Sequence, residues 1–356
     1  MAALSGKMER VQKRPTSWGY LGLKLPINSV SPEAKVHQHT TGVCVMRLSG
    51  ILFAGLVFLR TAAVSDAQTT IRADVNLVQL SVRVTDKEGR NVVGLGQDAF
   101  RLMIDKQDHP ITVFSGEDAP VTAGIVIDNS ASMAPKREQV IAAALAFARA
   151  SNQKDQMFVV HFNQRARFGL PDKKPFTGNI GELEAAISKF DLGGTTALYD
   201  GIMLANSQFL SHATYGRKIL LVITDGGDNS SRASLPGTLE ALVDSGVIVY
   251  PIGLFDASNA DQNPGILSRI ADVTGGESFF PAAVAETTRI CEAIAADVRR
   301  QYTLGFAGAE DGQYHEISVT ASDPKRGPLK VHTRPGYFAM KPRGSANRSA
   351  IKDGIR

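Results

Sequence analysis

Between residues 119 and 300, short apolar runs alternate with segments that have helical periodicity. The apolar runs are continuous, which is typical of strands buried on both faces of a parallel sheet. This order predicts an α/β fold with a doubly wound, mostly parallel, Rossmann-like sheet covered by helices. We expect strands at 123–128, 157–162, 218–224, 247–253 and 277–280, and helices near 136–150, 180–190, 197–210, 236–245, 264–273 and 284–300.

The segments on either side, 68–118 and 301–340, have a different pattern, in which apolar and polar residues alternate. That period of two indicates half-buried strands, which we place at 73–84, 100–104 and 111–114 and in the runs YTLGF, YHEISVT and LKVHT. Each flank alone has too few strands for a stable core. We therefore expect the two flanks to form one small β-sandwich, with the 119–300 domain inserted between them. The last residues, 341–356, are expected to be a disordered basic tail.

The first 67 residues contain a nine-residue apolar core, ILFAGLVFL, at 51–59. A basic residue precedes this core and small residues follow it, up to a possible cleavage site after Ala67. This is the pattern of a secretory signal peptide, and the core is short for a membrane-spanning helix. We interpret Met46 as the true start and 1–45 as a suspect extension. The sequence predicts an exported protein that is periplasmic, extracellular or associated with the cell envelope. An uncleaved N-terminal anchor is the alternative, and would be the protein's attachment to a membrane.

The formal net charge of +4 comes from the two ends of the chain. Residues 68–340 contain 26 Lys and Arg against 31 Asp and Glu, a net charge of −5. This balance gives no basic face for nucleic acid, so we expect no nucleic-acid partner. The chain has 2 cysteines, too few for a disulfide-stapled scaffold or a cysteine-based zinc site.

Polar side chains follow two of the predicted strands and open one helix. Asp128, Ser130 and Ser132 follow the first parallel strand, Asp225 follows the 218–224 strand, and Thr196 precedes the 197–210 helix. Ligands of open α/β sheets bind at the carboxyl ends of the strands, so these loops should converge. Carboxylate and hydroxyl oxygens suit a hard cation, namely Mg²⁺, Mn²⁺ or Ca²⁺. Because few of the ligands are anionic, such a cation could accept one more carboxylate from outside.

These motifs resemble the metal-ion-dependent adhesion site, or MIDAS, of von Willebrand factor A domains. Asp128, Ser130 and Ser132 match its D-x-S-x-S motif, and Asp225 matches the aspartate of its T-D-G motif. Thr196 matches its threonine, and Thr195 is the less favoured alternative for that position. The resemblance covers 119–300, and the flanks resemble a bacterial group of exported "VWFA-related" proteins. It implies that these five side chains hold a divalent cation, with Mg²⁺ first. It also implies an adhesion or interaction module that captures an Asp or Glu carboxylate of a protein partner.

Enzyme motifs do not fit the sequence, and we expect no enzyme. Phosphatases of the haloacid dehalogenase type need a second aspartate where Ser130 stands, and neither G-x-S-x-G nor a G-x-G-x-x-G after the first strand is present. The alternative function is a structural envelope protein in which the metal only stabilises the fold.

Other polar residues near these motifs have simpler interpretations. Asp128 could merely cap a helix. We interpret Asp228 as a solvated loop residue, Asp200 as a helix-surface residue, His161 as a core or rim histidine and Cys291 as a buried, inert thiol.

Overall fold

The computed structural model describes residues 76–189, 191–255 and 262–341. The predicted export signal at 51–67 and almost all of the predicted tail at 341–356 lie outside these residues. Among the described residues, no helix combines the length and the apolarity needed to cross a membrane.

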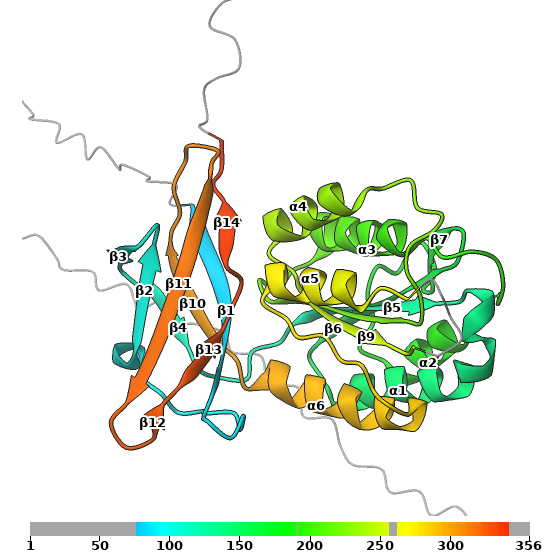
Figure 1. The fold of residues 1–356 in the computed structure, drawn as a ribbon, viewed down its shortest axis with the longest axis horizontal. Helices are drawn as coiled ribbons and strands as arrows, with labels where there is room; N and C mark the ends of the chain where they lie inside the picture. Colours follow the sequence, from blue (N-terminus) through cyan, green and yellow to red (C-terminus); the bar gives the residue numbers. More distant parts are fainter. Residues whose placement is uncertain (1–75, 190, 256–261, 342–356) are drawn as a thin grey trace, which may run out of the picture. The chain divides into compact units, whose positions relative to one another are not determined.

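A five-stranded, mostly parallel sheet forms the centre of the α/β domain (Figure 1). Its first strand, β5, lies in the middle and is buried along its whole length, because parallel neighbours flank it and helices cover both faces. The edge strand β7 is antiparallel to β6. In spatial order the strands are β7 (Ala166–Phe168), β6 (Gln156–Phe162), β5 (Thr122–Asp128), β8 (Lys218–Thr224) and β9 (Ile248–Gly253).

Two groups of helices cover this sheet, with α1, α2 and α6 on one face and α3, α4 and α5 on the other (Figure 1). Side-chain caps begin three of them, because Asn179, Ser234 and Asn263 each accept the backbone N–H three residues later. The helices are η2 (Ala131–Lys136), α1 (Arg137–Ala150), α2 (Ile180–Ser188), α3 (Leu198–His212), α4 (Leu235–Ser245), α5 (Pro264–Thr274), η3 (Val284–Glu286) and α6 (Thr287–Arg299).

Strands from the two flanks pair with each other in antiparallel sheets. In the first sheet, β1 (Leu77–Thr85) lies beside β10 (Tyr302–Ala307), with Leu80 opposite Leu304. In the second, β2 (Phe100–Ile104) pairs with β11 (Tyr314–Asp323). One apolar core joins the inner faces of both sheets, so residues more than 200 positions apart stabilise one another. The remaining elements are η1 (Gln97–Ala99), β3 (Gln107–His109), β4 (Val113–Ser115), β12 (Gly327–Pro328), β13 (Lys330–His332) and β14 (Gly336–Phe338).

The predicted fold class is confirmed, since a mostly parallel sheet with helices is flanked in sequence by antiparallel sheets. One expected strand is wrong. Residues 277–280 form no strand, and Phe279 makes an isolated bridge with Ile252. The first flank also has a strand that the sequence did not predict, because Asp105 and Lys106 adopt positive φ angles and close a tight hairpin between β2 and β3.

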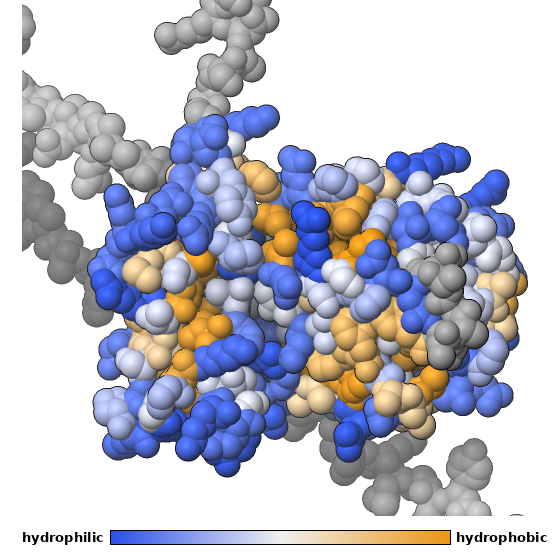
Figure 2. Space-filling view, in the orientation of Figure 1, coloured by the Kyte–Doolittle hydropathy of each residue, from blue (hydrophilic) through white to orange (hydrophobic). Residues whose placement is uncertain are grey.

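The face drawn in Figure 2 is hydrophilic over much of its area, with hydrophobic residues gathered in smaller regions. Large apolar side chains at the surface of the described residues are few and spread over many elements, as is normal for a folded protein.

Candidate metal-binding site

Backbone hydrogen bonds hold the loop after β5 against the loop that precedes α3. The amide of Asn129 donates to the carbonyl of Phe162 at 2.7 Å, and the amide of Gly193 donates to the carbonyl of Asn129 at 2.9 Å. A longer bond of 3.4 Å joins the amide of Ala131 to the carbonyl of Gly194. The two glycines, Gly193 and Gly194, have positive φ angles, which a glycine adopts without the steric cost of a side chain. The GGTT sequence thus lets the chain turn directly beside the D-x-S-x-S loop.

Asp128 is the last residue of β5 and its carboxylate is buried. Its Oδ1 accepts the backbone N–H of Ser130 at 2.8 Å, and its Oδ2 accepts the hydroxyl of Thr224 at 2.6 Å. Burial raises the pKa of Asp128 to about 6, against the opposing effect of these hydrogen bonds, because a charged carboxylate loses its hydration inside the protein. The helix-cap interpretation does not fit, because Ser130 is the N-cap of η2, without a side-chain cap bond, and the second bond to Asp128 comes from a neighbouring strand.

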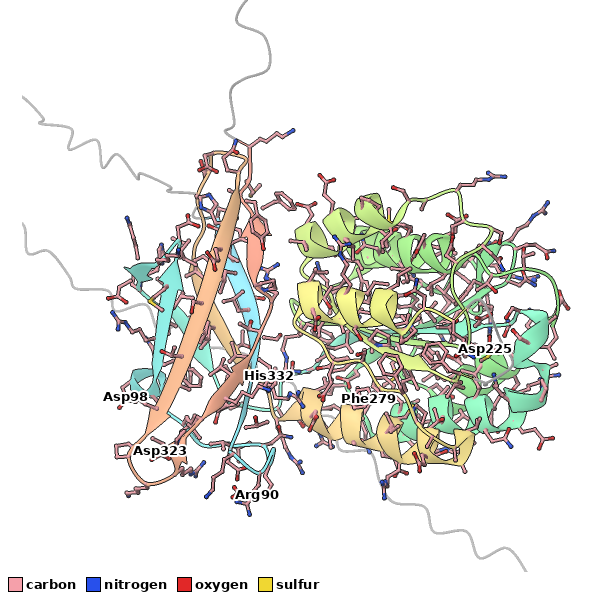
Figure 3. All side chains as sticks on the ribbon, in the orientation of Figure 1. Arg90, Asp98, Asp225, Phe279, Asp323 and His332 are labelled. Atoms are coloured by element: carbon pink, nitrogen blue, oxygen red, sulfur yellow. The ribbon has the colours of Figure 1, made fainter. Side chains whose placement is uncertain are left out.

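Two serines connect this loop to Asp225. The hydroxyls of Ser130 and Ser132 lie 3.2 Å apart, and Ser132 donates to Oδ1 of Asp225 at 2.9 Å. Asp225 is fully buried directly after β8 (Figure 3). Four of the five predicted site residues are therefore joined by direct hydrogen bonds, although 93 positions separate Ser132 from Asp225 in the chain.

Thr196 is attached to the loop that follows Asp225. Its backbone N–H donates to the side-chain oxygen of Asn229 at 2.8 Å, and its carbonyl accepts the backbone N–H of Asn229 at 3.0 Å. Its hydroxyl faces Gly226, because a Cβ built on that glycine would lie 3.9 Å from Thr196 Oγ1. The structure thus brings all five predicted residues to the carboxyl-terminal edge of the sheet. Whether they bind a metal stays a prediction.

Sequence reasoning missed Lys136, which is buried in the same cluster. Its ammonium group donates to Oδ2 of Asp225 at 2.7 Å and to the carbonyl oxygen of Leu254 at 2.8 Å. The lysine lies four residues after Ser132, at the end of η2. The sequence shows a positively charged residue close to the motif, but it does not show that this residue is buried.

The chemistry of the five side chains fits a hard divalent cation, since they offer only carboxylate and hydroxyl oxygens. The described residues contain no group of three or more His, Cys, Asp or Glu side chains that could hold a metal. The bond from Lys136 to Asp225 is the one feature that opposes metal binding, because it already places a positive charge on a predicted ligand.

Two other aspartates near the site organise its loops. Asp200 accepts the backbone N–H groups of Arg232 and Ala233, and Asp228 accepts the backbone N–H of Tyr199 at 3.3 Å. Asp228 is therefore more than the solvated loop residue that we expected. Both carboxylates fix the loop after Asp225 to the first turn of α3, because short acidic side chains bond readily to nearby backbone groups.

His161 and Cys291 are both buried and lie apart from this chemistry. His161 donates from Nε2 to the carbonyl oxygen of Ala186 at 2.7 Å, and burial lowers its pKa to about 4. Burial likewise raises the pKa of the Cys291 thiol to about 12. A neutral histidine and a protonated thiol match the interpretations given from the sequence.

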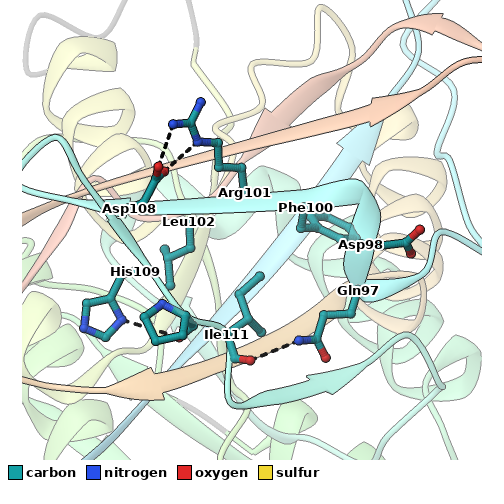
Figure 4. A pocket seen from close by; sticks show the side chains of 9 residues that line it. Gln97, Asp98, Phe100, Arg101, Leu102, Asp108, His109 and Ile111 are labelled. Carbon is teal, nitrogen blue, oxygen red and sulfur yellow. Dashed lines mark hydrogen bonds and ion pairs between the residues drawn. The ribbon is translucent and has the colours of Figure 1, made fainter.

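A groove of about 820 Å³ lies on the β-strands of the first flank and not at this cluster (Figure 4). Two of its charged groups are paired with each other, because Arg101 donates two hydrogen bonds to Asp108, at 2.6 and 2.7 Å. It is shallow, and its polar groups do not converge on one point. We therefore place the candidate site at the sheet edge. The groove is lined by Gln97, Asp98, Phe100, Arg101, Leu102, Asp108, His109, Pro110 and Ile111.

Residues 124–293 match the family model of the von Willebrand factor type A domain. This part of the chain is a VWA domain. The match begins inside β5 and ends within α6, so it includes all of the central sheet except the first two residues of β5, and all five predicted site residues. VWA domains are typically protein-interaction modules.

Several solved structures are similar to this chain. A von Willebrand factor type A protein from Catenulispora acidiphila is 14% identical, with a TM-score of 0.47 over 76% of this chain and 75% of that one. BatB from Bacteroides thetaiotaomicron is 18% identical, with a TM-score of 0.40 over 50% of this chain and 99% of that one. Proximal thread matrix protein 1 of the mussel byssus, with a zinc-occupied MIDAS motif, is 20% identical, with a TM-score of 0.44 over 54% of this chain and 48% of that one. A comparison with curated proteins found no match.

Proposed function

We propose that this protein is an exported, metal-dependent interaction module that captures a carboxylate of a protein partner. The observation that carries the proposal is the hydrogen-bonded row Ser130, Ser132 and Asp225 at the carboxyl edge of the VWA sheet. We propose Asp128, Ser130, Ser132, Thr196 and Asp225 as the ligands, with Asp225 binding directly or through a water molecule, and Mg²⁺ as the cation, with Mn²⁺ or Ca²⁺ as alternatives. Export rests on the apolar segment at 51–59, and the proposal gives the site no catalytic role.

Each residue of the site has a distinct task in this proposal. Asp128 provides the buried anionic ligand, and the bonds from Ser130 and Thr224 fix the orientation of its carboxylate. The serine and threonine hydroxyls bind without adding charge. A bound divalent cation would supply an electrophilic position for the partner's Asp or Glu side chain. The second candidate function is a structural envelope protein, favoured by the burial of Asp128 and Asp225, which a cation would stabilise.

The two functions differ in how the variant Asp128→Ala behaves. For an interaction module, Mg²⁺ binding measured by calorimetry is lost, as is Mg²⁺-dependent capture of a protein from envelope extract, while the variant stays folded in EDTA. For a structural role, wild-type protein melts at a much higher temperature with Mg²⁺ than with EDTA, and no capture depends on Mg²⁺. Asp272→Ala, which removes an exposed carboxylate of α5, is the matched control. Absence of Mg²⁺, Mn²⁺ and Ca²⁺ binding to the wild-type chain would contradict both functions.

A further inference from the structure

Lys136 forms a buried ion pair with one of the proposed metal ligands. Its Nζ lies 2.7 Å from Oδ2 of Asp225, and the two side chains are 6% and 0% exposed. A buried charge is costly unless it is paired and hydrogen-bonded. Lys136 meets both conditions, since it also donates to the carbonyl oxygen of Leu254.

The backbone places this lysine at the site. Lys136 ends η2, the short helix that follows the D-x-S-x-S loop, and Pro135 restricts the backbone directly before it. From there the side chain reaches Asp225 after β8 and Leu254 after β9, the neighbouring strand. Its charged end is buried at the sheet edge, whereas a lysine on an apolar background usually extends its ammonium group into water.

The carboxylate of Asp225 is thus shared between two donors. Its Oδ1 accepts the hydroxyl of Ser132, and its Oδ2 accepts the ammonium group of Lys136. The ammonium group supplies the positive charge that a metal ion would otherwise bring to this carboxylate.

We propose that Lys136 is a resident counter-cation of the site: it neutralises Asp225 in the metal-free domain, and a divalent cation binds in competition with this ion pair. This inference rests on the proposed function. The ion pair keeps the metal-free domain folded and lowers its affinity for metal, because two cations at one carboxylate repel each other. Occupancy of the site would then follow the metal concentration outside the cell rather than being permanent.

The test compares the full-length wild-type chain with Lys136→Met, using calorimetric titration with Mg²⁺ and Mn²⁺. We expect Lys136→Met to bind both metals about tenfold more tightly, or more, because a like charge is removed from the site. In EDTA this variant melts at a lower temperature than wild type, because the buried carboxylate of Asp225 loses its ammonium donor. Added Mg²⁺ raises its melting temperature by more than that of wild type.

Two further variants separate this effect from a general loss of stability. Lys218→Met removes a half-buried lysine at the start of β8, the strand that Asp225 follows, and should leave metal affinity unchanged. The double variant Lys136→Met with Asp225→Asn removes both charges and should recover melting temperature in EDTA.

NMR of isotope-labelled lysine in the wild-type chain provides a measurement that does not depend on a variant folding. We expect the Lys136 signal to shift on Mg²⁺ titration while the Lys218 signal stays in place. A Lys136 signal unmoved at metal saturation, or equal metal affinity of wild type and Lys136→Met, overturns this inference and leaves the proposed function standing. Metal binding by neither protein overturns both.

Discussion

Thr224 donates a 2.6 Å hydrogen bond from its hydroxyl to Oδ2 of Asp128, and both side chains are buried. The two residues end the neighbouring parallel strands β8 and β5, whose register places Ile223 opposite Ile127 one position earlier. Asp128 thus receives one bond from its own loop and one from the next strand, so the orientation of its carboxylate depends on correct pairing of the sheet.

Replacement of Thr224 by valine should therefore destabilise the VWA domain. Valine keeps the shape of threonine but removes the donor, so a buried carboxylate loses a hydrogen bond. We expect a cost of about 1.5–3 kcal/mol in the free energy of unfolding, measured with urea in EDTA at neutral pH. Thr238→Val is the matched control, because Thr238 is equally buried but donates to a neutral carbonyl, that of Ser234 at 3.0 Å. An equal cost for the two variants would contradict a special role of the Asp128 bond.

The residues of the candidate site could be chosen from the sequence because the position of a strand end is a local property. Asp128 and Asp225 each follow a continuous apolar run, and parallel strands must end at the same edge. Their approach therefore follows from the topology, without knowledge of any particular contact.

Lys136 shows why the remainder could not be predicted. In sequence it is one of two successive basic residues before an amphipathic helix, which is typical of a solvated position. Its burial depends on a carbonyl oxygen 118 positions away, at Leu254. The hairpin at Asp105 and Lys106 was missed for a related reason, since two residues other than glycine take positive φ angles there. Such a turn lacks the Asn-Gly or Asp-Gly signal that identifies most hairpins of this kind.

Close packing around Gly124 leads to a second prediction, which concerns the stability of the sheet. A Cβ at this position in β5 would lie 2.6 Å from the ring of Phe158 and 2.7 Å from the side chain of Leu220, so these side chains or the neighbouring strands would have to move. We expect Gly124→Ala to lower the free energy of unfolding by about 1–3 kcal/mol, measured by denaturant titration. Gly265→Ala is the control, because the contact there, 3.5 Å from Asn263, is ordinary and a helix favours alanine. A Gly124→Ala domain as stable as wild type would show that the sheet can widen at this point.

The thiol of Cys291 should be inert in the folded protein. It is fully buried in α6, and burial raises its pKa to about 12, so almost no thiolate is present near neutral pH. In a Cys44→Ser variant, we expect a disulfide reagent at about pH 8 to react with Cys291 only after denaturant is added. A chain in which both cysteines are replaced by serine gives the blank. Rapid reaction without denaturant would mean that α6 opens in the native state.

His315 should make stability depend on pH in the range where histidine titrates. Its Nδ1 lies 2.7 Å from a carboxylate oxygen of Asp105, and its Nε2 lies 3.1 Å from one of Asp311. These hydrogen bonds raise the pKa of His315 above its ordinary value of 6.5. Because the folded state binds the proton more tightly than the unfolded state, the stabilisation is complete below pH 6.5 and is lost as the pH rises through the raised pKa.

The measurement is the difference between the urea unfolding midpoints of wild type and His315→Gln. Both midpoints are determined by circular dichroism at pH values from about 5.5 to about 8.5. We expect this difference to fall as the pH rises. For His332→Gln, the same difference in urea midpoint should rise with pH. Burial and the nearby Arg83 lower the pKa of His332, so the folded state favours the neutral ring. The stabilisation from His332 is therefore lost as the pH falls. If the wild-type and His315→Gln midpoints run parallel across the whole range, the bonds from Asp105 and Asp311 do not favour the protonated ring.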